Sequence, residues 1–115
     1  MTRPVLKFDL AEEAEALRLE QGWRTSGHSA KSLAKHQDMT IVLIAMKRDT
    51  RIKEHLTEGA VSIQVLAGRI AVHVGTKTID APAGSLLALD RGLPHDVQAL
   101  DDSSFVLSVC GRKKR

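Results

Sequence analysis

The chain has 115 residues, of which 43% are hydrophobic, 27% are charged and 3% are aromatic, with a formal net charge of +3. This length fits one domain, and no apolar run approaches the roughly 20 residues of a membrane-spanning helix. The last five residues, Gly-Arg-Lys-Lys-Arg, hold four positive charges, so the rest of the chain has a formal net charge of −1. Because it has so few aromatic side chains and a nearly neutral body, the chain lacks the features of a protein that binds nucleic acid or a membrane.

Two features of the sequence bear on the cellular compartment. The first residues, Met-Thr-Arg-Pro, lack the long apolar core of a secretory signal. The single cysteine, Cys110, cannot form an internal disulfide, which fits a reducing environment. We therefore expect a cytoplasmic protein in which Cys110 is packed rather than reactive, and in which residues 111–115 form a basic tail.

Residues 1–31 are predicted to form an N-terminal extension with one short helix. Asp9 suits an N-cap, and the acidic, alanine-rich run Leu10–Leu17 places glutamates at the positive end of the helix dipole. The apolar segment Pro4–Phe8 is suited to pairing with an exposed strand edge of a second copy. Because closed two-fold assemblies are the commonest, we expect a homodimer.

Residues 32–110 are predicted to form the main domain. Short segments of β-branched and aliphatic residues alternate there with turn residues such as Gly68, Gly75 and Gly84, a pattern typical of an all-β sandwich or barrel. Met39 and Met46 are interpreted as core fillers in this domain, and His28 and His36 as surface residues. The predicted strands cover residues 32–36, 39–47, 51–56, 60–67, 69–75, 77–81, 85–90, 95–100 and 103–110.

Alternation of apolar and polar residues indicates which side chains face inward. In residues 69–74, Ile70 and Val72 share one face, which predicts that His73 points away from the interior. In residues 51–56, Lys53 and His55 share a face, but alternation alone does not say whether that face is the inner one.

A second histidine follows a turn whose residues fix its position. Gly92 suits the turn because it has no Cβ and reaches positive φ without strain, and Pro94 fixes the backbone immediately before His95. This arrangement predicts that His95 opens a strand with its imidazole directed into the barrel.

The stretch from Gly84 to Ala99 resembles the second motif of the cupin superfamily. Gly84, Gly92 and His95 match that motif at the correct spacing, while Asp90 replaces its proline and Ala99 its asparagine. The fifteen residues between the two motifs, 69–83, are similar to the short spacing of small bacterial cupins. The resemblance implies a single-domain cupin β-barrel, a jelly roll, with a short N-terminal helix.

The stretch from Lys47 to Gly68 resembles the first cupin motif less closely. His55 and Gly68 match it, whereas Lys47 replaces the first glycine and Lys53 the first histidine. Counted back from Gly68, the glutamate position falls on Val61. Counted forward from His55, the glutamate position falls one residue before Val61; Glu58 lies two residues short of it and Gln64 lies beyond it, so that only a bulge could recruit Gln64 as a ligand.

The resemblance implies that a complete cupin motif pair holds a divalent metal with two histidines and the glutamate of the first motif and the histidine of the second. Here Lys53 and Val61 stand at two of these four positions, and two imidazoles alone make a weak site. An ammonium group about 5 Å from a dication adds a repulsion of several kcal/mol at an effective dielectric constant near 20. We therefore expect no metal cofactor.

We expect Lys53, His55 and His95 to converge at the barrel mouth and to bind a small molecule that is anionic or strongly hydrogen-bonding. Two simpler interpretations stay open: the Lys53 stem could carry its amine to solvent, and His95 could bond to a backbone carbonyl. The alternative function is a metal-dependent dioxygenase, isomerase or lyase that uses His55 and His95 with one Fe, Mn, Ni or Zn ion. The sequence does not decide whether the protein is an enzyme.

Overall fold

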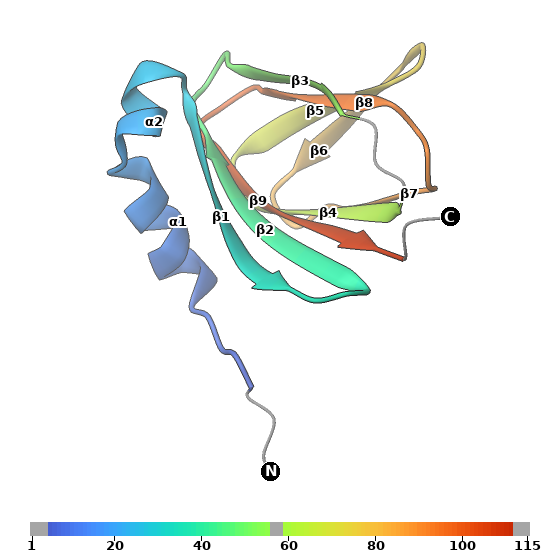
Figure 1. The fold of residues 1–115 in the computed structure, drawn as a ribbon. Coiled ribbons are helices and arrows are strands. Elements are labelled where there is room, and N and C mark those ends of the chain that lie inside the picture. The colour runs from blue at the N-terminus through green and yellow to red at the C-terminus, as the bar shows by residue number, and fades with distance from the viewer. Residues whose placement is uncertain (1–4, 56–58, 112–115) are drawn as a thin grey trace.

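The structure is a computed structural model that describes residues 5–55 and 59–111, apart from the side chains of Glu54 and His55. Two helices precede nine strands in this part of the chain (Figure 1). In chain order the elements are α1 (Leu10–Arg18), α2 (Gln21–Thr25), β1 (His28–Lys35), β2 (Met39–Met46), β3 (Arg51–His55), β4 (Ala60–Ala67), β5 (Arg69–Val74), β6 (Lys77–Pro82), β7 (Leu86–Leu89), β8 (His95–Ala99) and β9 (Ser103–Cys110).

The strands form two antiparallel sheets that face each other. The five-stranded sheet has the order β1-β2-β9-β4-β7, and the four-stranded sheet has the order β3-β8-β5-β6. Figure 1 shows the two sheets as the walls of a flattened barrel, with α1 and α2 lying against the outside of the five-stranded sheet. The predicted all-β fold with a short N-terminal helix is confirmed.

Two elements differ from the sequence-based prediction. Strand β1 begins at His28 rather than at residue 32, because His28 already pairs with Met46 of the neighbouring strand. The helix α2 was not predicted, since its five residues contain Gly22 and have no helical periodicity. Burial of Trp23 against the sheet stabilises this helix instead.

The main core lies between the two sheets. Because successive side chains of a strand point to opposite faces, each strand contributes every second residue to it. Phe105, Ile63 and Met46 are among its fully buried members. The complete buried set is Met46, Val61, Ile63, Val65, Ile70, Val72, Ala81, Leu89, Val97, Ala99 and Phe105.

A second core lies between the helices and the outer face of the five-stranded sheet. Leu17 of α1 and Trp23 of α2 are buried there against Leu33 and Leu43 of the sheet. The helix α1 begins at its predicted N-cap, where the Asp9 side chain accepts a hydrogen bond from the Glu12 backbone N–H at 3.1 Å. In the part of the chain that the structure describes, neither α1 nor α2 is long and apolar enough to cross a bilayer.

The ends of β2 and β9 depart from the predicted packing. Cys110 and Met39 are opposite each other in the ladder, and both are exposed, although we expected both to be packed. Neither residue belongs to the two buried clusters, to which β2 and β9 contribute residues from their other halves. Met46, at the other end of β2, is fully buried as predicted, and His36 is exposed.

One exposed ion pair joins β5 to β6. The Arg69 guanidinium donates to both oxygens of Asp80, at 2.7 Å and 2.6 Å. The hydrogen bond from Arg69 holds the pKa of Asp80 below its ordinary value, and the same bond raises the pKa of Arg69. Because solvent screens an exposed ion pair, the bond between Arg69 and Asp80 orients the strand edge more than it stabilises the fold.

Candidate functional site

A cavity of about 230 Å³ lies between the two sheets. Its wall comes from β2, β3, β8 and β9, whose inward-facing positions are almost all apolar in the sequence. Three polar residues also line it: Lys53, His95 and Asp96. The apolar lining residues are Ile44, Ile52, Val97, Phe105, Leu107 and Val109.

Strand β8 directs the His95 imidazole into this cavity. The side chains of His95, Val97 and Ala99 are buried, and those of Asp96 and Gln98 are on the opposite face of the sheet. The turn before the strand contains Gly92 at a φ of 77°, in the left-handed region where only glycine is unstrained. The turn residues seen in the sequence therefore set the phase of β8 and place His95 inside, with 5% of its surface exposed.

One hydrogen bond fixes the protonation pattern of the neutral His95 ring. Its Nδ1 lies 3.1 Å from the backbone oxygen of Leu93. Because a carbonyl oxygen only accepts, Nδ1 must carry the proton, and Nε2 of the neutral ring is then an acceptor. No described residue forms a hydrogen bond with Nε2. The simpler interpretation of His95, a bond to a backbone carbonyl, is thus correct for one ring nitrogen and leaves the other available.

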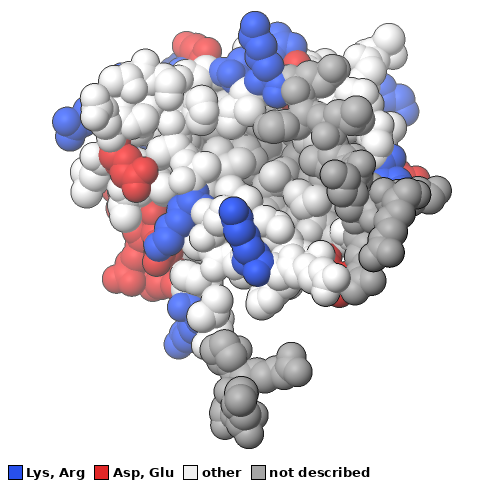
Figure 2. Space-filling model, viewed as in Figure 1, with Lys and Arg blue, Asp and Glu red and all other residues white. Residues whose placement is uncertain are grey.

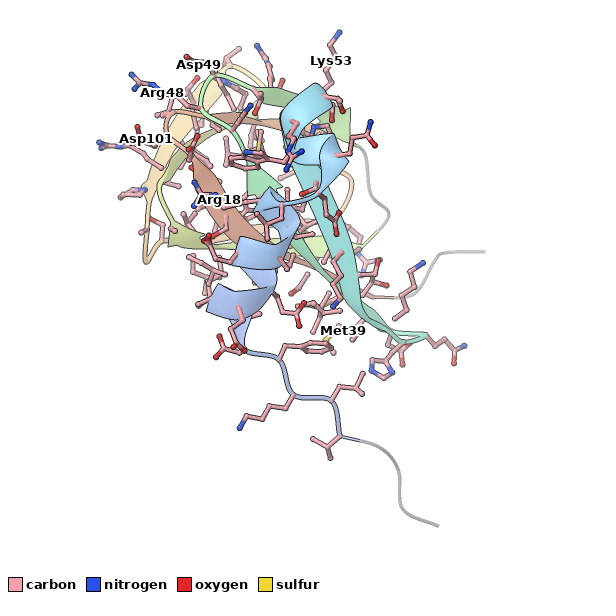
Figure 3. All side chains as sticks on the ribbon, turned by 90° about the vertical axis from the view of Figure 1, so that its left-hand side faces the viewer. Arg18, Met39, Arg48, Asp49, Lys53 and Asp101 are labelled. Carbon is pink, nitrogen blue, oxygen red and sulfur yellow. The ribbon has the colours of Figure 1, made fainter. Side chains whose placement is uncertain are left out.

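Lys53 lies at the rim of the cavity and is exposed. Figure 3 shows its side chain extending away from the sheets. Ile52, which pairs with Val97, lines the cavity, so alternation along β3 directs the next side chain, Lys53, to the opposite face. We expected the amine to lie beside His95, and the structure instead directs it to solvent.

The backbone of His55 pairs with that of His95 across β3 and β8. This register places the two histidines opposite each other, which the cupin resemblance also implies. The His55 side chain lies outside the described residues, and so does Glu58. The expected convergence therefore rests on His95 alone among the described side chains.

Two of the four positions at which a metal ligand is expected hold no donor suited to a divalent ion. Lys53 offers an ammonium group, and Val61 is an aliphatic side chain in the main core with 3% of its surface exposed. Gln64 faces the opposite side of its sheet, where it lines a groove beside Phe8 and Leu33. Among the described side chains, which do not include those of Glu54 and His55, no group of three or more His, Cys, Asp or Glu residues is arranged to hold a metal. A usual metal site needs at least three protein ligands.

A polar network covers the outer face of the four-stranded sheet, opposite the cavity. The Arg51 guanidinium donates twice to Asp96 Oδ2, at 2.6 Å and 3.2 Å, and so ties β3 to β8. His73 points outward as predicted, with Nδ1 3.0 Å from Thr78 Oγ1 and Nε2 3.3 Å from Gln98 Oε1. Sequence reasoning missed Asp96, because its partner is set by strand register and no local pattern signals it.

Basic and acidic side chains gather at different places on the surface. Figure 2 shows acidic side chains on the side where α1 lies, and basic side chains at the top, where β3 lies in Figure 1. The acidic group on α1 includes Glu12 and Glu13 in its first turn. The cavity wall, by contrast, is mostly apolar.

No protein-family model and no curated protein matches the chain. Solved structures do match it. A conserved protein of unknown function from Streptococcus pyogenes is 19% identical, with a TM-score of 0.78 over 98% of this chain and 93% of that one. A cupin superfamily protein from Desulfitobacterium hafniense is 14% identical, with a TM-score of 0.70 over 72% of this chain and 76% of that one.

An enzyme is also among the similar structures. A salicylate 1,2-dioxygenase from Pseudoaminobacter salicylatoxidans is 14% identical, with a TM-score of 0.79 over 90% of this chain and 34% of that one. At these identities the likeness concerns the arrangement of the strands and not the reaction. Together with the two sheets and the position of His95, it leads to one conclusion. The chain is a small protein with the cupin fold.

Proposed function

We propose that the protein binds a small molecule in the cavity between its two sheets, and that it does so without a resident metal ion. The observation that supports this proposal is the buried His95 ring, whose Nδ1 is bonded to Leu93 while its Nε2 has no partner among the described residues. A mostly apolar wall with one or a few polar groups is the usual composition of a small-molecule site.

The size of the cavity supports a small ligand. Its volume of about 230 Å³ lies below the range of roughly 300–1,000 Å³ that is common for drug-sized ligands. An engineered apolar cavity of about 150 Å³ is large enough to bind benzene. The cavity between the sheets therefore has room for one six-membered ring with a short substituent, or for an aliphatic molecule of similar size.

The alternative, a metal-dependent enzyme that uses His55 and His95, would need at least one further ligand. Lys53 is exposed at the rim and Val61 has no donor atom, so neither supplies that ligand. This mismatch of the donor set favours binding by the cavity wall and His95.

Filling the cavity tests the proposal. In the variant Leu107→Phe, the larger side chain occupies the space that the ligand would use, because Leu107 is part of the cavity wall. We expect fragments that bind the EDTA-treated protein to shift amide resonances of β2, β8 and β9 in NMR spectra. We expect Leu107→Phe to weaken their binding at least about tenfold, a loss of about 1.4 kcal/mol.

The matched control is Leu86→Phe, the same chemical change at a position on β7 that is 69% exposed. It should leave fragment binding unchanged. Equal binding by Leu107→Phe and the unaltered protein would contradict the proposal, and so would the absence of any bound fragment in a library of small rings and branched aliphatic compounds.

A further inference from the structure

The wall of the cavity offers a ligand one described side-chain acceptor that faces inward. Of its three polar residues, Asp96 directs its carboxylate to the outer face, where Oδ2 accepts from Arg51 and the buried Oδ1, which has no hydrogen-bond partner among the described residues, lies 4.0 Å from His73 Nε2. Lys53 is exposed at the rim. Among the described side chains of the wall, His95 is therefore the one with an available polar atom, Nε2, inside the cavity.

The surroundings of His95 are apolar on β5 and on the facing sheet. Strand β5 presents Val74, the register partner of His95. The facing sheet contributes Ile44 from β2 and Phe105 from β9 to the same cavity. A ligand that fills the cavity displaces water from His95 Nε2, and this acceptor is then unfavourable unless the ligand supplies a donor.

A charged ligand would be poorly stabilised in this cavity. A carboxylate that leaves water needs a paired cation or several donors to offset its desolvation. The Lys53 amine is directed to solvent, and the Arg51 guanidinium is bonded to Asp96 on the other face of the sheet. The structure therefore changes the expectation from the sequence, which placed a cation beside His95 and favoured an anionic ligand.

From these three observations we infer the class of ligand, an inference that rests on the proposed function. The ligand is a small, uncharged, mostly apolar alcohol or phenol that carries one hydroxyl group. The hydroxyl donates its hydrogen bond to His95 Nε2, and the hydrocarbon part contacts the apolar wall formed by Ile52, Val97, Leu107 and their neighbours. One donor for one acceptor leaves neither the ligand hydroxyl nor His95 Nε2 unpaired in the complex.

Three probes of similar size test this class: phenol, methoxybenzene and benzoate. Phenol and methoxybenzene share the ring, but only phenol donates a hydrogen bond, and benzoate adds a negative charge. By titration calorimetry at pH 8 we expect phenol to bind about five- to tenfold more tightly than methoxybenzene, the gain of one net hydrogen bond. Benzoate should bind more weakly than both.

Two variants locate the discriminating group. His95→Phe removes the acceptor and should make phenol and methoxybenzene bind equally. His73→Phe is the same change on the outer face of the same sheet and should retain the preference for phenol. If His95→Phe fails to fold, the comparison of the three probes on the unaltered protein still tests whether the ligand is a hydroxyl compound.

The outcomes separate the two proposals. Equal binding of methoxybenzene and phenol, tighter binding of benzoate, or an undiminished preference for phenol in His95→Phe would overturn the hydroxyl class and leave a small-molecule site standing. If none of the three probes binds and the fragment library also yields no binder, both the ligand class and the proposed function are overturned.

Discussion

Replacement of Gly68 by alanine is expected to lower the free energy of unfolding by about 3–5 kcal/mol, which is enough to unfold many small domains. Gly68 connects β4 to β5 at a φ of 79°, where a side chain is already strained. An added Cβ would also lie 2.2 Å from the Asp102 backbone oxygen and 2.8 Å from Ser103 Cα. These are backbone atoms of the adjoining turn, so relief would require the main chain to move. Urea unfolding followed by circular dichroism measures the loss.

Gly92→Ala is the matched control for the alanine substitution at Gly68. Gly92 has nearly the same φ, 77°, but a Cβ built there meets no atom within 4 Å. It should cost only the conformational strain, about 1–2 kcal/mol. If the two alanine variants lose equal stability, the close approach of the β8–β9 turn to Gly68 is not what makes glycine necessary there.

Phe105→Ala is expected to cost about 3–5 kcal/mol, the usual range for removing a buried aromatic ring. Phe105 lies in the first half of β9, pairs with both Ile44 and Val65 and has 1% of its surface exposed. Its ring belongs to the main core and also forms part of the cavity wall, so its loss merges new empty space with the existing cavity. The urea midpoint measures this effect.

The exposed residue Val5 provides the control for the substitution at Phe105. With 92% of its surface exposed, Val5→Ala should change stability by less than about 0.5 kcal/mol. A loss below 1 kcal/mol for Phe105→Ala would show that the two sheets do not pack around this ring as described.

Most of the fold could be predicted from the sequence, because local chemistry specifies where its strands end. Gly68, Gly75, Gly84 and Gly92 all have positive φ, and each lies at or beside a predicted turn. The position of α2 could not be predicted in this way. Its stability comes from burying Trp23 against a sheet whose strands are distant in sequence, and periodicity within five residues carries no such information.

The candidate site could be predicted only in part, and β3 and β8 show why. The turn residues before His95 fix the phase of β8, so its inward direction follows from local sequence. The phase of β3 is set only when the strand pairs with β8, and the register of that pairing shifts between Ile52 and His55. Lys53 was expected inside because it occupies the position of the first histidine of the cupin motif, and alternation alone did not say which face of the strand is the inner one. Its side chain is exposed. The bond between Arg51 and Asp96 escaped prediction because strand register sets it.

The exposure of Cys110 and Met39 also depends on tertiary arrangement. Both residues continue apolar strands, so the sequence favours burial. The helices α1 and α2 bury residues from the middle and far end of β2, Leu43 and Ala45, and leave the strand's beginning exposed. How far a helix extends over a sheet is not encoded in the strand that it covers.

The central claim is that the cavity and its His95 ring bind a small molecule without help from a metal ion. Titration calorimetry with phenol tests it most directly, on protein dialysed against EDTA and again after Fe, Mn, Ni or Zn ions are added back. We predict the same dissociation constant in every sample, because Lys53 and Val61 offer such an ion no further ligand. Binding that disappears in the EDTA-treated protein and returns with one equivalent of a divalent ion would contradict the claim.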